Sequence, residues 1–340
     1  MENQIFFSLI VPVYNRPAEL AELLESLAHQ KDPGALEVVV VEDGSQQPSE
    51  QLVASFRDRL QLQYLKKPNT GPGDSRNFGM RHALGEYFIL VDSDCVLPPG
   101  YFRQVRESLE LDYADCYGGP DAAHPDFNSL QQAISFSMTS PWSTGGIRGG
   151  RKDQGNFQPR SFNMGLSRKA FEASGGFGNI HPGEDPDLSL RLAKQGFRIR
   201  YLPGAVVYHK RRISWRSFYR QVYKFGLARP ILNRWHPGSG RPAYWFPTFF
   251  MLGMGASIIL PFLLPGRLGF LPLVAFGCYL LIFTIAALRA TGNPGIALKA
   301  LLAVLIQFTG YGWGFLKSTI LLTFSSKKPQ ALFPGLFFNP

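Results

Sequence analysis

Continuous apolar runs alternate with amphipathic segments over the first part of the chain. The amphipathic segments predict helices at residues 18–30 and 73–84, the first with Asn15 as its cap. Uninterrupted β-branched runs between such helices indicate a parallel sheet with both faces covered. The fold class predicted is therefore α/β with a mostly parallel sheet. Four runs predict its strands: residues 6–13, 36–45, 60–67 and 86–94.

The pattern becomes irregular over residues 112–160, which are rich in glycine, serine, proline and asparagine. A loop of this length inside a compact domain is usually functional or disordered. Regular structure is expected again as a helix at 187–196, followed by strand-like residues 198–209. Residues 210–241 mix aromatic and basic side chains, which is typical of an amphipathic helix at a membrane interface.

Two charge-free stretches follow, Tyr244–Pro265 and Leu268–Leu288. Each is long enough to cross the hydrocarbon core, which takes roughly 20 apolar residues. A third stretch, 300–324, is interrupted by Lys317, so it spans the membrane, stops short or lies partly in the interface. We therefore expect two or three transmembrane helices.

The charges are distributed unevenly along the chain. All 25 acidic residues lie at or before Asp187, and 13 Lys and Arg residues lie between Arg191 and Arg241, just before the first apolar stretch. Basic residues beside a span are typical of a cytoplasmic face in contact with anionic lipid. A nucleic-acid partner is the weaker interpretation. Because no cleavable signal is visible, we expect a multi-pass protein of the cytoplasmic membrane with a cytosolic N-terminal domain.

The resulting organisation has four parts. An α/β domain is expected at 1–212 and a basic aromatic interfacial segment at 213–243. A membrane region at 244–326 and a tail at 327–340 complete the chain.

Polar residues follow the predicted strands at the edge where parallel sheets bind ligands. The first loop, PVYNRP, contains no glycine, so it does not match a dinucleotide fingerprint or a P-loop. A nicotinamide dehydrogenase is therefore disfavoured. The residues that converge on this edge are Tyr14, Asn15, Arg16, Glu42, Asp43, Asp92 and Asp94.

Asp92 and Asp94 are like charges one residue apart, which repel each other unless a positive group lies between them. On an extended backbone both side chains would point to one side and Ser93 to the other. Carboxylate oxygens are ligands that Mg²⁺ or Mn²⁺ prefers, together with substrate phosphates. The alternative is a simple aspartate turn before PPGYF.

The chain resembles the family 2 glycosyltransferases over roughly residues 5–210. The motifs that carry the resemblance are SLIVPVYNR, VVVVEDGS, NTGPGDSRNFG, YFILVDSDC, FNMGLSRKAFEASGGF and GEDPDLSLRLAKQGFRI, in the family's order and approximate spacing. The resemblance implies a GT-A fold and an inverting transfer of sugar from a nucleotide-diphosphate sugar, with Mg²⁺ or Mn²⁺ on the donor diphosphate. The donor-binding residues that it implies are Pro12, Tyr14, Asn15, Arg16, Asp43, Arg76, Asp92, Ser93 and Asp94, with Asp43 facing the base and Asp92 and Asp94 serving ribose and metal.

The resemblance also implies a catalytic base in GEDPDL, namely Asp185, with Glu184 as the substitute. One carboxylate must take the proton of the acceptor hydroxyl as it attacks. Locally, however, Asp185 before Pro186 also suits a helix N-cap.

Three further groups are candidates with open alternatives. His209 is either a third metal ligand, as in some relatives, or structural. Arg211 and Arg212 either neutralise the departing diphosphate or face lipid. The loop at 144–165 is either a mobile surface loop or an acceptor-binding segment, with Arg148, Arg160 and Asn163 as its candidates.

The function predicted is metal-dependent transfer of a sugar to a hydroxyl of a lipid-linked or cell-envelope glycan acceptor. If polyprenyl phosphate is the acceptor instead, no hydroxyl base is needed. A membrane scaffold that has lost catalysis is a rival of another class, and the retained Asp92, Asp94 and Asp185 disfavour it.

Overall fold

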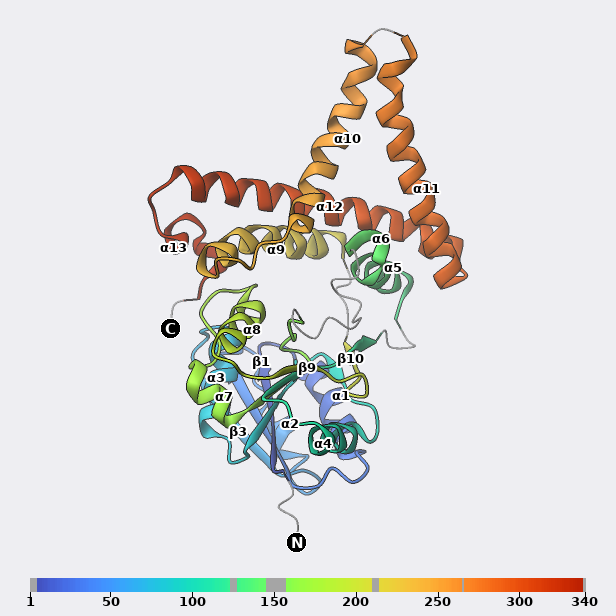
Figure 1. Ribbon diagram of the computed structural model, residues 1–340. Coiled ribbons are helices and arrows are strands. Elements are labelled where there is room, and N and C mark those ends of the chain that lie inside the picture. The colour runs from blue at the N-terminus through green and yellow to red at the C-terminus, as the bar shows by residue number, and fades with distance from the viewer. Residues whose placement is uncertain (1–4, 123–126, 145–156, 210–213, 265, 339–340) are drawn as a thin grey trace. The chain divides into compact units, whose positions relative to one another are not determined.

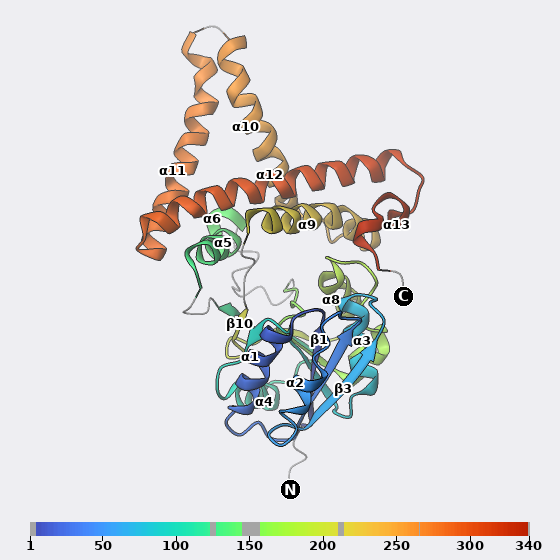
Figure 2. The ribbon, with the colours of Figure 1, turned by 180° about the vertical axis from the view of Figure 1, so that it is seen from behind.

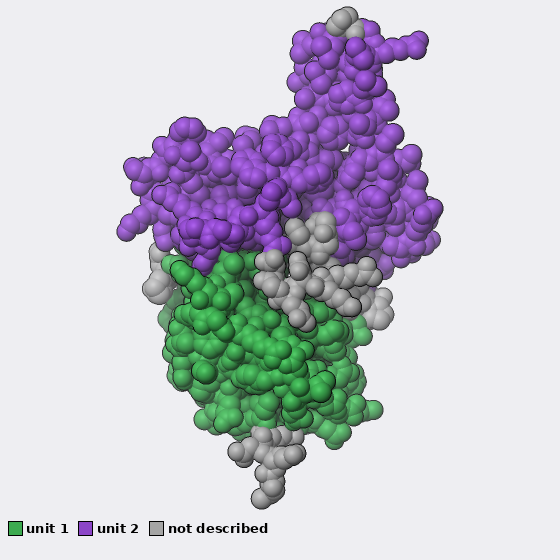
Figure 3. Space-filling view, in the orientation of Figure 1, with its two compact units in different colours: residues 1–124, 152–210, 337–340 green, residues 125–151, 211–336 purple. Residues whose placement is uncertain are grey.

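The computed structural model describes residues 5–122, 127–144, 157–209, 214–264 and 266–338 (Figure 1). The chain forms two compact units, drawn in two colours in Figure 3. The first unit contains residues 1–124, 152–210 and 337–340, and the second contains residues 125–151 and 211–336.

A seven-stranded sheet forms the centre of the first unit, with strand order β3-β2-β1-β4-β8-β6-β9. All neighbouring strands are parallel except where β8 pairs with β4 and with β6. The prediction of a mostly parallel α/β sheet is thus confirmed. The strands are β1 (Phe7–Val13), β2 (Leu36–Asp43), β3 (Leu62–Lys67), β4 (Tyr87–Leu90), β6 (Cys116–Gly118), β8 (Met164–Ser167) and β9 (Ile199–Tyr201).

Helices cover both faces of this sheet, because β1 contributes side chains to two separate apolar cores. Leu9 and Val11 belong to one core and Ile10 to the other. The alternation follows from the two-residue period of a strand. The helices are α1 (Pro17–Ala28), α2 (Glu50–Ala54), α3 (Pro72–His82), α4 (Tyr101–Leu111), α7 (Arg168–Ser174) and α8 (Glu184–Lys194).

A small second sheet has the order β5-β10-β7, formed by β5 (Cys95–Val96), β10 (Val207–His209) and β7 (Asp121–Ala122). Its strand β10 is antiparallel to β5, with His209 opposite Cys95. This register places the backbone of His209 beside the residue that follows Asp94.

The second unit is helical. Among its described residues, three segments are long and apolar enough to cross a membrane: Pro242–Leu263, Gly266–Thr291 and Pro294–Phe324. Its helices are α5 (Ser129–Thr139), α6 (Pro141–Thr144), α9 (Trp215–Trp235), α10 (Phe246–Leu263), α11 (Leu271–Thr291), α12 (Pro294–Phe324) and α13 (Pro329–Leu332). Within this unit α10 and α11 stand side by side, whereas α12 runs across them along α9 and α5 (Figures 1 and 2).

Helix α5 departs from the irregular structure expected over residues 112–160. Asn128 accepts a hydrogen bond from the backbone N of Gln131, and the Gln131 side chain accepts one from the backbone N of Asn128. This reciprocal capping box satisfies two backbone donors at the start of the helix. The glycines that suggested a loop lie elsewhere in the stretch.

Candidate functional site

The loops that follow β1 and β2 are tied together by Asn15. Its Oδ1 accepts hydrogen bonds from the backbone N of Gln46 at 2.7 Å and of Gln47 at 3.2 Å, and its own N donates to Ser45. Asn15 has φ 54°, a left-handed conformation that asparagine tolerates better than most residues. The expectation that Asn15 caps the first helix is wrong: Arg16 occupies the cap position, with no side-chain cap bond.

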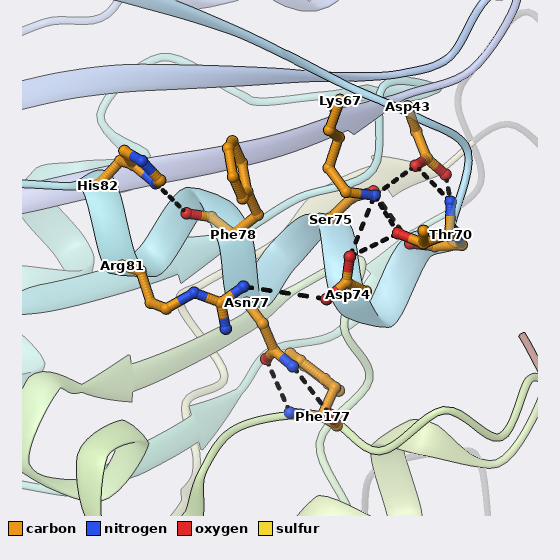
Figure 4. A network of polar contacts seen from close by, with 11 residues as sticks. Asp43, Lys67, Thr70, Asp74, Ser75, Asn77, Phe78, Arg81, His82 and Phe177 are labelled. Atoms are coloured by element: carbon orange, nitrogen blue, oxygen red, sulfur yellow. Dashed lines mark hydrogen bonds and ion pairs between the residues drawn. The ribbon is translucent and has the colours of Figure 1, made fainter. Parts of the chain in front are cut away.

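Asp43, at the end of β2, is buried and fully engaged (Figure 4). Its two oxygens accept hydrogen bonds from the backbone N of Thr70 and of Gly71, each at 3.0 Å. The buried Lys67 ammonium lies 2.7 Å from Asp43 Oδ1 and 3.1 Å from Asp74 Oδ2. Asp43 thus fixes the loop between β3 and α3 while carrying a compensated charge.

We expected the aspartate pair after β4 to lie on an extended strand, and this expectation is wrong. The strand ends at Leu90, and the backbone N of Cys95 donates to Asp92 O at 3.1 Å, which closes a turn. Asp92 and Asp94 then bind different arginines: Arg76 Nη2 lies 2.5 Å from Asp92 Oδ1, and Arg16 Nη1 lies 2.8 Å from Asp94 Oδ2. The two like charges are tolerated because each carboxylate has its own guanidinium.

Arg76 joins this turn to helix α8. It lies on α3 with only 3% of its side chain exposed, and its Nη1 is 3.8 Å from Glu184 Oε1. Its guanidinium carbon also lies 5.5 Å from the centre of the Phe177 ring. A buried charge is stable only when it is paired. The charge of Arg76 is stabilised by Asp92 and Glu184, and it stabilises the charges of these carboxylates in turn.

Glu184 begins α8 and is bound on two sides. His181 Nδ1 lies 2.7 Å from Glu184 Oε1, and the backbone N of Gly183 donates to Glu184 Oε2 at 2.9 Å. Burial disfavours a charged imidazole, but the Glu184 carboxylate outweighs it and raises the pKa of His181. Burial by itself would raise the pKa of Glu184. The positive charges of His181 and Arg76 outweigh burial and lower that pKa overall. Glu184 is therefore held as an anion.

The pKa of Asp185 is shifted in the opposite direction from that of the adjacent Glu184. Burial, followed by the negative charge of Glu184, raises the pKa of Asp185 to about 6. Within the described chain, its Oδ1 is buried and has no hydrogen-bond partner. The N-cap alternative is wrong, because Gly183 occupies that position with φ 129° and no side chain caps the helix. The Asp185 carboxyl therefore has a pKa close to neutral pH, and it does not cap the helix.

The other predicted residues include Tyr14, Pro12, Ser93 and Asn163. Tyr14 is 49% exposed beside the β1 end, Pro12 lies in β1 opposite Val41, and Ser93 is buried inside the turn. Asn163 is buried, and its Nδ2 donates to Pro120 O at 3.1 Å and Ala205 O at 2.6 Å. Those hydrogen bonds hold strand connections together, so its amide is already occupied.

Arg160 lies near Asp185 and lowers its pKa by electrostatic attraction, against the dominant effect of burial. Only the backbone of His209 is described. Among the described residues, no three histidine, cysteine or acidic side chains form a metal-binding group. Arg148, Arg211 and Arg212 lie outside the described residues.

The domain of the first unit is known from other proteins. Residues 8–175 match the family model described as Glycosyl transferase family 2. The protein carries a family 2 glycosyltransferase domain. A structure of the mannosyltransferase PcManGT from Pyrobaculum calidifontis, solved with GDP-Man and Mn²⁺, covers 96% of this chain and 89% of its own at a TM-score of 0.56 and 20% identity. That likeness shows the GT-A type of fold.

Two curated relatives match parts of the chain. The poly(ribitol-phosphate) β-N-acetylglucosaminyltransferase TarS of Staphylococcus aureus is 44% identical over 112 residues, which is 32% of this chain and 20% of TarS. The chondroitin synthase of Escherichia coli is 26% identical over 235 residues, 60% of this chain and 34% of that protein. The matched chain thus spans about a third of one relative and a fifth of the other.

Two residues of the glycosyltransferase domain were missed by sequence reasoning, and both had a readable signal. Lys67 lies opposite Asp43 in the parallel register of β2 and β3, so the ends of the two predicted strands already suggested the pair. His181 precedes Glu184 by three residues at the start of a predicted helix, a spacing that brings side chains together.

Proposed function

We propose that the first unit transfers a sugar, with inversion, from a nucleotide-diphosphate sugar to an acceptor hydroxyl, and that Asp185 is the general base. The observation that carries the proposal is the state of Asp185: a buried oxygen without a hydrogen-bond partner in the described chain, on a carboxyl with a pKa of about 6. A base with a pKa near the working pH combines the correct protonation state with a useful affinity for the proton.

The acceptor oxygen forms a bond to the anomeric carbon, and its proton passes to Asp185 Oδ1. The bond between the anomeric carbon and the diphosphate oxygen breaks on the opposite face, and the departing diphosphate keeps the electron pair. Glu184, held as an anion by His181 and Arg76, keeps the Asp185 carboxyl basic.

Arg76 and Arg16 support the leaving group in this proposal. Both lie at the turn that carries Asp92 and Asp94, and guanidinium groups bind phosphate oxygens through several parallel hydrogen bonds. A donor diphosphate bound there would share the arginines with the aspartates.

The aspartates fit a divalent ion of the Mg²⁺ or Mn²⁺ class. Both offer carboxylate oxygens, and the Asp92 side chain is 32% exposed and engages Arg76 through Oδ1. Such ions take one or two carboxylates and complete their shell with water and substrate phosphate. When bound, the ion supplies Lewis-acid stabilisation of the departing diphosphate. The GDP-Man and Mn²⁺ in the PcManGT structure support this class of donor and metal.

We propose a lipid-linked or cell-envelope glycan as the acceptor, because three helices of the second unit are apolar enough to cross a membrane. The basic residues that precede them suit anionic lipid.

The test is a screen of the purified protein against a panel of nucleotide-diphosphate sugars, with Mn²⁺ and Mg²⁺, that measures release of the nucleoside diphosphate. We expect one donor to be hydrolysed slowly without acceptor and the anomer released to have inverted configuration by NMR. Asp92→Asn should lose this activity, whereas the matched change Asp58→Asn, on an exposed surface, should keep it. If calorimetry detects no binding of any nucleoside diphosphate, the proposal fails and the protein is a membrane scaffold that has lost catalysis.

A further inference from the structure

The last described residues belong to the same compact unit as the N-terminal domain. Phe337 forms an isolated antiparallel bridge with Ile180, and the backbone N of Phe338 donates to Asn179 O at 3.0 Å. The Phe338 ring also lies 6.0 Å from the His181 ring, centre to centre. None of the three segments able to cross a membrane belongs to this first unit, so residues that pack together within it lie on one side of a membrane. The chain therefore returns to the side from which it left.

This return determines how many times the chain crosses. It leaves the first unit after residue 210 and re-enters it at residue 337, so it crosses any membrane an even number of times. The second unit, however, offers three segments of sufficient length and apolarity. At least one of the three therefore does not cross.

Helix α12 differs from α10 and α11 in length and burial. Its 31 residues make a helix of about 46 Å, against about 30 Å of hydrocarbon. The 18 residues of α10 and the 21 of α11 give about 27 and 31 Å, which match that thickness. In the most apolar window of α12, 44% of residues are buried within the protein, compared with 17% and 11% for the other two. Helix α12 is therefore more enclosed by protein than α10 or α11.

Helix α9 packs against the C-terminal half of α12 so closely that the two backbones are in contact. A Cβ atom on Gly226 would lie 2.2 Å from Tyr311 O, and one on Gly314 would lie 2.4 Å from Tyr223 O. Only glycine permits so close an approach. The two helices therefore share one depth relative to a membrane.

That depth is the interface, because α9 is strongly basic. A charged side chain in hydrocarbon is costly, and Trp and Tyr residues favour the headgroup level. The exposed cations of α9 are Arg216, Arg220, Lys224 and Arg234.

The N-terminal half of α12 makes polar contacts with α5. Ser137 Oγ donates to Gln307 Oε1 at 2.9 Å, and Lys299 Nζ donates to Ser129 Oγ. Lys317, further along α12, is exposed. Polar or charged groups thus lie at intervals along the whole helix, as in a surface-lying helix.

We infer that α10 and α11 form a membrane-spanning hairpin and that α12 lies along the membrane surface with α5 and α9, against lipid headgroups. The crosswise course of α12 relative to the hairpin agrees with this topology (Figures 1 and 2). The residues between α10 and α11 carry one basic side chain, Arg267, whereas residues 226–245, just before α10, carry three: Arg229, Arg234 and Arg241. By the positive-inside rule, the glycosyltransferase unit and the C-terminus are cytoplasmic. The inference is independent of the proposed sugar transfer.

Cysteine labelling in vesicles tests this topology. Cys95 and Cys116 are buried and Cys278 is exposed, so the background carries Cys278→Ser. Single thiols are then introduced by Ser55→Cys in the first unit, Leu268→Cys between α10 and α11, and Ser326→Cys after α12, all at exposed positions. A membrane-impermeant maleimide is applied to everted and right-side-out vesicles, with detergent-opened vesicles as the measure of full labelling.

We expect Ser55→Cys and Ser326→Cys to be labelled in everted vesicles and Leu268→Cys in right-side-out vesicles. Labelling of Ser326→Cys together with Leu268→Cys would show that α12 crosses and would overturn the inference. Labelling of all three in one orientation would exclude a spanning hairpin. Protease digestion of a tag fused after Pro340 gives a second readout, and protection of the tag in everted vesicles would likewise contradict the inference.

Discussion

Arg76 Nη2 donates to Asp92 Oδ1 at 2.5 Å, although the two residues come from different elements, α3 and the turn after β4. The same guanidinium lies 3.8 Å from Glu184 at the start of α8. One buried cation therefore links the proposed metal site to the proposed base. Its removal should affect both the stability of the fold and the chemistry.

We predict that Arg76→Ala destabilises the first unit by about 3–5 kcal/mol, because it leaves carboxylates without their buried partner. Thermal unfolding of the detergent-solubilised protein measures the effect. Arg81→Ala is the matched control: Arg81 lies on the same helix, is 52% exposed and is 3.9 Å from Asp74. Exposed pairs contribute about 0–1 kcal/mol, so equal losses in the two variants would contradict the role assigned to Arg76.

The rate should depend on pH through Asp185. A base must be deprotonated to accept the acceptor's proton, and the pKa of Asp185 is raised to about 6. Activity should therefore be full above this pH and fall about tenfold per pH unit below it. The pH profile of kcat/KM reports the free enzyme, so it is the quantity to measure. If kcat/KM instead begins to fall only near pH 4, burial does not raise the pKa of this carboxyl.

Metal removal should abolish transfer, and added Mn²⁺ should restore it. Asp94→Asn removes one proposed ligand, so the Mn²⁺ concentration for half-maximal activity should rise by at least tenfold. Arg16→Gln breaks the 2.8 Å pair with Asp94 but keeps the carboxylate, and should leave the metal requirement in place. Activity of the wild type in excess chelator would refute metal dependence.

Adjacent lysines at the end of β3 offer a comparison within one sequence. Lys67 is 7% exposed and bound to Asp43 and Asp74, whereas Lys66 is 55% exposed and paired with Glu50. Lys67→Met should lower the free energy of unfolding by about 3–5 kcal/mol because Asp43 stays buried and charged. Lys66→Met should change it by less than about 1 kcal/mol. Similar unfolding temperatures for both variants would contradict the network in Figure 4.

The strands were predictable because their signals are local and strong. Val38 to Val41 form an uninterrupted β-branched run, and the polar residues Glu42 and Asp43 mark the strand end. The convergence of Asp43, Asp92 and Asn15 at one edge then followed from parallel topology. The placement of the aspartates, though not their partners, was therefore within reach of the sequence.

The partners were not predictable, because they depend on contacts between distant segments. The Arg76–Glu184 and Arg16–Asp94 pairs join residues far apart in sequence. The turn at Asp92 replaced the expected extended strand because the Cys95 backbone N bonds back to Asp92 O. Likewise, Asp185 suits an N-cap by residue type, and only the structure shows Gly183 in that position.

The central claim is that Asp185 takes the acceptor proton, and the turnover of Asp185→Asn with the identified donor and acceptor tests it most directly. The amide cannot accept that proton, so we predict a fall in kcat of about 10²–10⁴-fold, with donor binding unchanged by calorimetry. Asp187→Asn, on the same helix and paired with Arg191 at 2.9 Å, should retain most of the activity. Near-normal turnover of Asp185→Asn would contradict the account and favour a phosphate acceptor that needs no base.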